Sequence, residues 1–220
     1  LTGIKHNDAM VYNIHEIMRD VRVCLDQNMT NEQLLQTDDV DTLALDDIVK
    51  SKILEAVVRV HSDAPTYLLE EGHTFGDAVY WGELESGWVL LPDDFMRLIV
   101  FEMSDWEQAV FRAISPAEPE YALQRQRIKA LRGTAQKPVC AIVNRAEGKA
   151  LEFYSCKSRD AYVSRALYVP YPQIDKDDGI DISERCYTAV IYTVASLVLS
   201  TYGETEKSAV MADLAKSIIQ

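Results

Sequence analysis

Histidine and cysteine, which bind transition metals and act in catalysis, are scarce in this chain: it has four of each among 220 residues. His15 is followed by glutamate, as in the zinc-protease sequence HExxH, but Arg19 stands where the second histidine should be. The acidic run from Asp175 has glycine at its fifth position and Cys186 at its twelfth, whereas a calcium loop needs glycine at the sixth and glutamate at the twelfth. We interpret this run as an acidic, capped start of a helix, and the sequence predicts no metal site.

The four cysteines, Cys24, Cys140, Cys156 and Cys186, are widely spaced, and no two of them form a CxxC pair. Two fall in helical patterns and two in strand-like ones, which is typical of reduced, buried cysteines in a protein made in the cytosol. Phosphate-binding glycine loops and the GxSxG turn of serine hydrolases are absent from the sequence. We therefore expect no cofactor and predict that the protein is not an enzyme.

One enzymatic alternative is a hydrolase or thiol-dependent protein whose site is assembled from distant residues. Such a site would place Cys140 or Cys156 beside an activating histidine, with His61 and His73 as the candidates. Sequence alone does not bring either thiol next to a histidine. Another alternative is a regulatory or binding module that is not part of a larger assembly.

The chain is strongly acidic, with 35 Asp and Glu residues against 22 Lys and Arg, for a net charge of −13. This balance argues against coating DNA or RNA and against docking on anionic membranes, because both need clustered cations. The one basic cluster, QRQRIKALR at residues 124–132, is interpreted as a solvated helix face or arm, with contact to nucleic acid or an acidic neighbour as the alternative. The longest apolar run, residues 187–202, is too short and too polar for a membrane span.

Hydrophobic spacing predicts two helices near the start of the chain. Apolar residues recur at helical intervals over residues 11–27, and again from residue 41 or 42 to just before Pro65. Residues 1–10 precede the first pattern, and we expect them to be a flexible leader.

Helical spacing returns near the end of the chain. A long apolar helix is expected to run to about Tyr202, with Asp181 or Ser183 as its cap. Gly203 is expected to break it, and a last helix should cover residues 204–219.

The middle of the chain is punctuated by glycine and proline and predicts short strands. Its clearest hairpin lies over residues 140–156, with the turn around residues 146–148, whereas residues 119–131 predict a short helix or an irregular arm. The fold class is therefore α+β. We predict an antiparallel helical bundle from residues 11–65 and 181–220, interrupted by a β-rich insertion over residues 66–180.

Several stretches of the chain resemble one class of viral protein. They are LLPDDFMRLIVFEMSDWEQAV, PEYALQRQ, GTAQKPVCAIV, LEFYSC and the C-terminal ERCYTAVIYTVASLVLSTYGETEKSAVMADLAKSII. In pattern and order they are similar to the head-to-tail adaptor proteins of tailed bacteriophages, of the crAss-like and tail tubular A types. The resemblance covers most of residues 11–220 and includes no catalytic signature.

The resemblance implies a structural virion protein located at the head–tail junction and made in the host cytoplasm. Such proteins form homo-oligomeric rings, commonly twelve-fold, that connect the portal protein to other ring and tail proteins. DNA passes through the ring without sequence-specific binding, and no membrane is involved.

A helix that is apolar on nearly every side needs more cover than one partner helix provides, and neighbouring subunits in a closed ring would supply it. The resemblance and this argument together predict partner contacts at the C-terminal apolar residues and at the strand over residues 95–103. For that strand, burial inside its own subunit is an equally good interpretation. The predicted partner-binding residues are Leu197, Leu214, Ile218, Ile219, Phe95 and Leu98.

Overall fold

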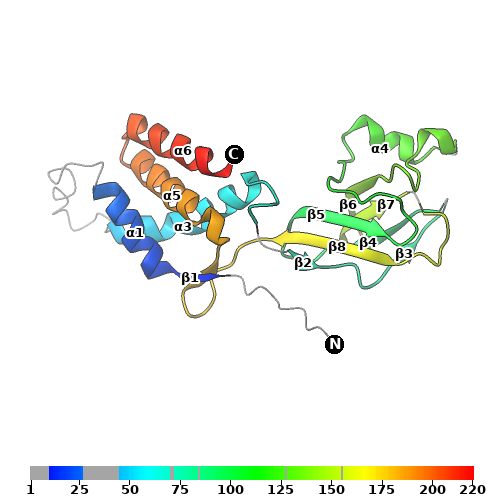
Figure 1. Ribbon diagram of the computed structural model, residues 1–220, viewed down its shortest axis with the longest axis horizontal. Coiled ribbons are helices and arrows are strands. Elements are labelled where there is room, and N and C mark those ends of the chain that lie inside the picture. Colours follow the sequence, from blue (N-terminus) through cyan, green and yellow to red (C-terminus); the bar gives the residue numbers. More distant parts are fainter. Residues whose placement is uncertain (1–9, 27–44, 70–71, 84, 127, 155) are drawn as a thin grey trace. The chain divides into compact units, whose positions relative to one another are not determined.

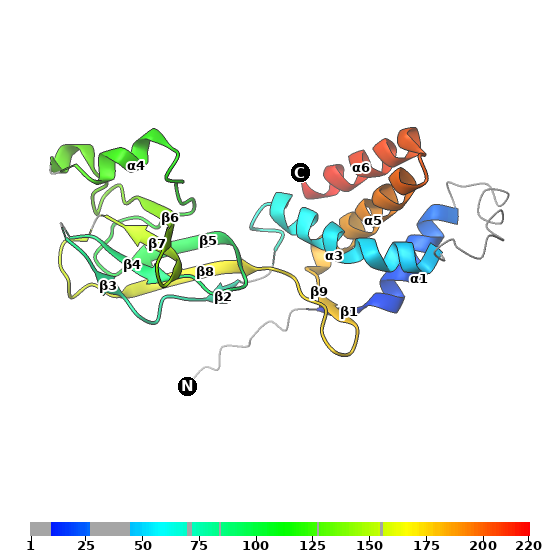
Figure 2. The same cartoon turned by 180° about the vertical axis from the view of Figure 1, so that it is seen from behind.

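The protein has a helical unit and a β-rich unit, and its mixed content, 39% helix and 26% strand, confirms the α+β class. Contacts assign Leu1–Glu70 and Pro172–Gln220 to the first unit and Glu71–Tyr171 to the second, so the second is shorter at both ends than the expected insertion over residues 66–180. Figures 1 and 2 show the two groups of elements. The residues described by this computed structural model are 10–26, 45–69, 72–83, 85–126, 128–154 and 156–220, so most of the expected leader and the expected start of the second helix lie outside the described residues.

The helical unit is built around α5. Its side chains pack against α6, α3 and α1, and all four helices contribute to one apolar core. In chain order the elements of this unit are β1 (Val11–Asn13), α1 (Ile14–Asp26), α3 (Leu45–Asp63), β9 (Gly179–Asp181), η2 (Glu184–Cys186), α5 (Tyr187–Thr201) and α6 (Thr205–Ile219).

The first helix begins three residues later than its apolar spacing predicted. Val11–Asn13 instead form strand β1, which pairs antiparallel with β9, with Tyr12 opposite Ile180. The side chain of Asn13 then accepts a hydrogen bond from the backbone N–H of His15 at 2.8 Å. An asparagine in this position satisfies one of the first N–H groups of a helix, which explains the start at Ile14.

The expected side-chain cap before α5 is wrong. Asp181 lies in β9. The hydroxyl of Ser183 donates a hydrogen bond to the carbonyl of Leu68 at 2.6 Å and accepts none from the N–H groups at the helix start. Ser183 is buried, so its hydroxyl needs a partner within the protein, and the Leu68 carbonyl is that partner. A short turn of 3-10 helix, η2, leads into α5.

Gly203 ends α5 as predicted. Its φ is +78°, the left-handed region, and the N–H of Glu204 bonds the carbonyl of Leu199 while that of Gly203 bonds Ser200. This pair of bonds is the Schellman arrangement, which satisfies the last carbonyls of a helix. The turn makes α5 and α6 a helical hairpin, and side-chain hydrogen bonds between Ser196 and Ser208 join the two helices.

The β-rich unit holds two antiparallel sheets, of order β2-β8-β5 and β3-β4-β7-β6. The hairpin β6–β7 is confirmed, with Arg145 opposite Gly148 across its turn. Residues 109–114, one of the short apolar segments expected to be strands, are not a strand. They contribute only single bridges at Val110 and Ile114. The elements are β2 (His73–Thr74), β3 (Tyr80–Trp81), β4 (Gly87–Leu90), β5 (Phe95–Met103), α4 (Pro119–Gln124), η1 (Lys129–Leu131), β6 (Cys140–Arg145), β7 (Gly148–Phe153) and β8 (Val163–Pro170).

An aromatic core joins these two sheets. Phe101 of β5 stacks on Phe153 of β7 with ring centroids 5.9 Å apart, and the ring of Trp106 meets Phe101 edge-on at 5.7 Å. Phe101 and Phe153 are fully buried. The apolar strand over residues 95–103 therefore serves the core of its own unit.

The turn at Gly203 yields a stability prediction. A Cβ at this position would meet no atom within 4 Å, so any loss comes from the backbone conformation alone. We expect Gly203→Ala to lower the free energy of unfolding by about 1 kcal/mol. Gly203→Asn should lose less, because asparagine tolerates the left-handed region. Urea unfolding of the two variants checks this, and equal losses would show that φ is not the cause.

Candidate functional site

The most distinctive surface of the β-rich unit arises from the two-residue alternation of sheet β3-β4-β7-β6. On β7, Leu151 and Phe153 point into the aromatic core, so Glu152 points to the opposite face. Across the strands, Trp88 of β4 lies between Tyr80 of β3 and Glu152 of β7. This outer face of the sheet therefore combines an indole ring with a carboxylate.

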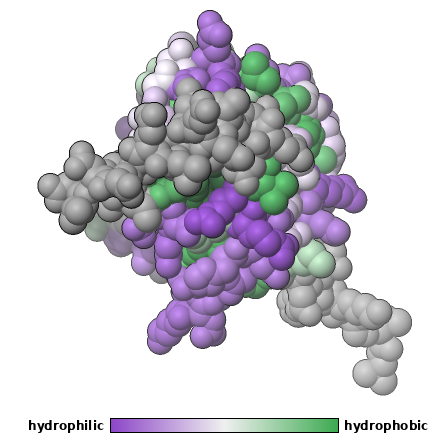
Figure 3. Space-filling view, turned by 90° about the vertical axis from the view of Figure 1, so that its left-hand side faces the viewer, coloured by the Kyte–Doolittle hydropathy of each residue, from purple (hydrophilic) through white to green (hydrophobic). Residues whose placement is uncertain are grey.

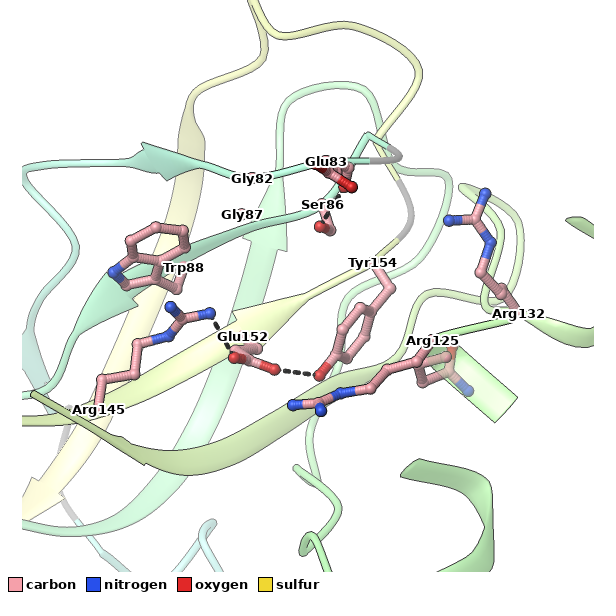
Figure 4. A pocket seen from close by; sticks show the side chains of 11 residues that line it. Gly82, Glu83, Ser86, Gly87, Trp88, Arg125, Arg132, Arg145, Glu152 and Tyr154 are labelled. Carbon is pink, nitrogen blue, oxygen red and sulfur yellow. Dashed lines mark hydrogen bonds and ion pairs between the residues drawn. The ribbon is translucent and has the colours of Figure 1, made fainter. Parts of the chain in front are cut away.

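A pocket of about 350 Å³ lies on this face (Figure 4). In the view of Figure 4, Arg145 and Arg132 approach from opposite sides, with the ring of Tyr154 between them. Gln124, Arg132 and Glu152 are each more than nine-tenths buried. The pocket is lined by Gly82, Glu83, Ser86, Gly87, Trp88, Gln124, Arg125, Arg132, Arg145, Glu152 and Tyr154.

The buried carboxylate of Glu152 is the centre of the polar contacts. Arg145 donates to its Oε1 at 2.5 Å, the Tyr154 hydroxyl donates to its Oε2, and the Tyr121 hydroxyl lies 3.4 Å from the same oxygen. A buried carboxylate needs such partners, since its desolvation is otherwise costly. Burial, and then the hydrogen bond to Glu152, raise the pKa of Tyr154 above its ordinary value, so this tyrosine remains a donor.

Two arginines are held in place by aromatic rings. The guanidinium carbon of Arg145 lies 3.8 Å from the centre of the Trp88 ring, which itself stacks with Tyr80. Arg125 lies over the ring of Tyr121 at 5.0 Å and donates to the Tyr121 hydroxyl at 2.7 Å. Cation–π contacts of this kind restrict the guanidinium groups before any ligand arrives.

The segment after α4 is fixed to the same pocket by Gln124. Its side-chain carbonyl accepts the backbone N–H of Gly133 at 2.7 Å, and its amide donates to the carbonyl of Glu120 at 3.0 Å. These bonds hold the neighbour of Gly133, Arg132, against the pocket wall. Arg132 and Tyr154 also line a second pocket of about 360 Å³, which contains Cys156 and Lys157.

The lining of the first pocket has a local excess of positive charge. Its three arginines face two acids, and one of these, Glu152, is already engaged by Arg145. The other acid, Glu83, is exposed. The β-rich unit around the pocket is nearly neutral, with 14 acidic and 12 basic residues in Glu71–Tyr171. Arg132 also lines the second pocket, together with Glu85, so the two pockets share one guanidinium.

The thiols are poorly suited to catalysis. All four cysteines are buried, and none forms a disulfide. Burial raises the pKa of Cys140 well above its ordinary value and, with the nearby charge of Asp105, raises the pKa of Cys156 to about 12. Because the thiolate is the reactive form, a raised pKa makes a cysteine less nucleophilic at neutral pH.

The candidate histidines are not gathered at these thiols. His61 is buried in α3 of the helical unit, and His73 is exposed in β2, where its ring meets Tyr168 edge-on. Cys140 and Cys156 lie in the aromatic core of the β-rich unit. Within the described ranges, no cluster of three or more His, Cys, Asp or Glu residues could hold a metal ion.

The acidic run from Asp175 is a turn. One carboxylate oxygen of Asp175 accepts the backbone N–H groups of Asp177 and Gly179, at 2.8 and 2.7 Å. Asp178 forms an ion pair with Lys50 at 3.4 Å. These contacts explain the acidic residues through local structure. None of the helices in the described ranges is both long enough and apolar enough to span a membrane.

The predicted partner-binding residues are not equally accessible. Phe95 and Leu98 are buried in the aromatic core, and Ile219 is buried in the helical core. Leu197 and Ile218 are half-buried against that same helical core. Leu214 is 41% exposed, and it is the one residue of the six with a largely free side chain.

The basic cluster at residues 124–132 is visible in the sequence, but we interpreted it there as a solvated helix face or arm. The structure places Arg132 in a buried position and directs it and Arg125 to a pocket shared with Trp88, Glu152 and Tyr154. The alternation of the hairpin strand could have assigned Glu152 and Tyr154 to one face. The approach of residues 124–132 to that face depends on long-range packing, which has no signal in local spacing.

No model of a known protein family matches this chain, and no curated protein matches it either.

The network around Glu152 predicts a large effect of one neutral substitution. Glu152→Gln keeps the shape of the side chain but leaves Arg145 without its counter-charge, so we expect the free energy of unfolding to fall by about 2–4 kcal/mol. Glu147→Gln, at the exposed turn of the same hairpin, should change it by less than about 0.5 kcal/mol. Urea unfolding measures both, and similar losses would mean that the Arg145 pair contributes nothing.

Alkylation of Cys156 tests the thiol hypothesis. Since its pKa is raised to about 12 from 9.0, the rate of reaction with iodoacetamide should keep rising well above pH 9 in the folded protein. The unfolded state ionises first, so the contribution of Cys156 to stability is complete below pH 9.0 and declines as the pH rises toward about 12. Mass spectrometry of each alkylated cysteine gives the rates. A fast reaction that levels off near neutral pH would favour a catalytic thiol.

Proposed function

We propose that the protein is a non-enzymatic structural subunit of a tailed-phage virion. It occupies the head–tail junction as part of a homo-oligomeric, twelve-fold ring that joins the portal to the tail and extends the DNA channel. Its helices form an antiparallel bundle that serves as the body of the subunit. The resemblance in pattern and order to head-to-tail adaptor proteins supports this function.

The observation that carries the proposal is an apolar strip on α6. Val210 and Leu214 are 56% and 41% exposed, and a spacing of four residues places them on one helix face. Met211, Ala215 and Ile219 of the same helix are buried in the unit. Figure 3 shows one face of the molecule, on which hydrophobic residues form patches among hydrophilic ones. A neighbouring subunit would cover the exposed pair.

The chemistry of the chain supports a geometric role. The raised pKa values of Cys140 and Cys156 disfavour a thiol enzyme, and the acidic surface is suited to a channel through which DNA slides without adhering. The strand over residues 95–103 is left out of the proposed interface, because its apolar side chains fill the aromatic core.

The test uses the double variant Val210→Asp with Leu214→Asp in a phage that encodes this chain. Both side chains are largely exposed, so the subunit should fold, whereas burial of two carboxylates in a ring contact is strongly unfavourable. We expect its copy number in purified particles to fall by at least about tenfold, measured by quantitative mass spectrometry against the major capsid protein.

The matched control is Val23→Asp, which places an acid at a 54% exposed valine of α1. It should enter particles at the wild-type level. Normal incorporation of the folded double variant would rule out the α6 interface. Absence of the wild-type protein from intact particles would discard the connector function.

A binding module outside the virion is the second candidate, and the arginine-lined pocket favours it. Such a module would be absent from particles and would still bind a ligand at this pocket.

A further inference from the structure

We propose that the α4–η1 segment (residues 119–131) of one copy of this chain packs against the apolar strip on α6 of a neighbouring copy. The inference rests on the proposed ring, because it names the surface that covers that strip. The residues of the segment that make the contact are Leu123, Arg125, Ile128 and Leu131.

The first observation is that the α4–η1 segment has an apolar side that its own sheet does not cover. On its inner side, the ring of Tyr121 meets that of Tyr154 edge-on at 6.5 Å, and Gln124 is buried. The N–H of Leu131 bonds the carbonyl of Ile128, and this spacing of three residues places their side chains on one side of the turn. The apolar side chains left 41%, 60% and 46% exposed are those of Leu123, Ile128 and Leu131.

The second observation is an uneven distribution of charge between the two units. The helical unit has 21 acidic and 10 basic residues, a net charge of −11, whereas the β-rich unit has 14 and 12. Two helical units repel each other, so a neighbouring copy covers α6 at a lower electrostatic cost with its β-rich unit. Within that unit, residues 119–131 include three basic residues and one acid.

The third observation is the charge along the border of the apolar strip on α6. At 3.6 residues per turn, Glu206 and Asp213 lie on the same side of Val210, and both acids are exposed. The nearer lysine of α6, Lys207, borders the opposite edge of the strip and pairs with Glu204 at 3.5 Å. An apolar strip with acids along one border is complementary to an apolar segment that carries an exposed arginine.

Arg125 is the arginine placed to meet these acids. It is exposed, and its guanidinium lies over the ring of Tyr121 at 5.0 Å and donates to the Tyr121 hydroxyl at 2.7 Å. A guanidinium has five N–H donors, so it can bond a carboxylate of another copy while it keeps this contact. The contact with Tyr121 also restricts the arginine before binding, which reduces the entropy lost in the complex.

The two surfaces belong to different parts of the chain, so the contact between copies is heterologous. Each copy offers its α4–η1 segment to one neighbour and its α6 strip to the next. A contact of this kind continues from copy to copy, and it gives a closed ring where the rotation between copies permits.

Sedimentation velocity of the full-length chain, at concentrations up to about 1 mM, tests the contact without other virion proteins. We expect association that rises with concentration and proceeds past the dimer, because a heterologous contact leaves one surface free at each end.

The decisive variants reverse two charges. Arg125→Glu and Asp213→Arg should each lower the association constant at least about threefold, the second although it reduces the net charge of the chain. The double variant should return to within about twofold of the wild type, because the ion pair is restored with its signs exchanged. Arg165→Glu is the matched control, since it makes the same charge change at an exposed position of β8 outside the segment, and it should have less than about a twofold effect.

Four results in solution would overturn the proposal. They are no association of the wild type at about 1 mM, association that stops at a dimer, equal effects of Arg125→Glu and Arg165→Glu, and a double variant no better than the single ones.

The variant Ile128→Asp with Leu131→Asp separates this contact from the proposed function. Its copy number in purified particles should fall by at least about tenfold. Wild-type incorporation of the folded variant would overturn the α4–η1 contact and leave the connector function standing. If the wild-type protein is absent from particles, the connector function is lost, whereas restoration by the double charge reversal in solution would still establish the contact.

Discussion

The helical unit depends on covering α5, whose apolar residues spread over most of its circumference. The α5–α6 hairpin covers one side, and α1 and α3, from the other end of the chain, cover the rest. Both chain ends must therefore meet before this core is complete, and Glu71–Tyr171 becomes an insertion for the same reason. Hydrogen bonds join the segment before the insertion to the segment after it. Ser183 donates to the carbonyl of Leu68, and Arg185 donates to that of Tyr67. Burying one apolar helix thus determines how the chain is divided.

In the β-rich unit the equivalent constraint is the alternation of β7. Phe153 has to point inward to stack on Phe101, so Glu152 must point outward, to the face that carries Trp88. A carboxylate there is acceptable only if donors surround it, and Arg145 with Tyr154 supplies them. The pocket is therefore a consequence of the core: the packing of Phe153 sets the position of Glu152, and Glu152 organises the arginines.

The features that the sequence predicted correctly are those that depend on interactions between residues close together in the chain. The break at Gly203 follows from a left-handed φ, and the β6–β7 hairpin follows from alternation with a short turn, so both were visible in the sequence. The cap expected at Asp181 or Ser183 was wrong, because the Ser183 hydroxyl bonds Leu68, a residue 115 positions away. The pocket was not predicted, for the same reason. Arg125 and Arg132 were interpreted as part of a solvated cluster, and only tertiary packing brings them to Glu152 and Tyr154. The partner contacts at Phe95 and Leu98 stay a prediction, and in the structure both side chains are buried in the aromatic core.

The two candidate surfaces recognise partners by different physics, which limits what each can do. The exposed apolar pair on α6 gains by excluding water, so it is suited to a contact that forms once and stays. The arginine-lined pocket lies in the β-rich unit, whose 14 acidic and 12 basic residues nearly balance. Its polar contacts are short-range hydrogen bonds and ion pairs, such as those from Arg145 to Glu152 and from Arg125 to Tyr121, which depend on geometry.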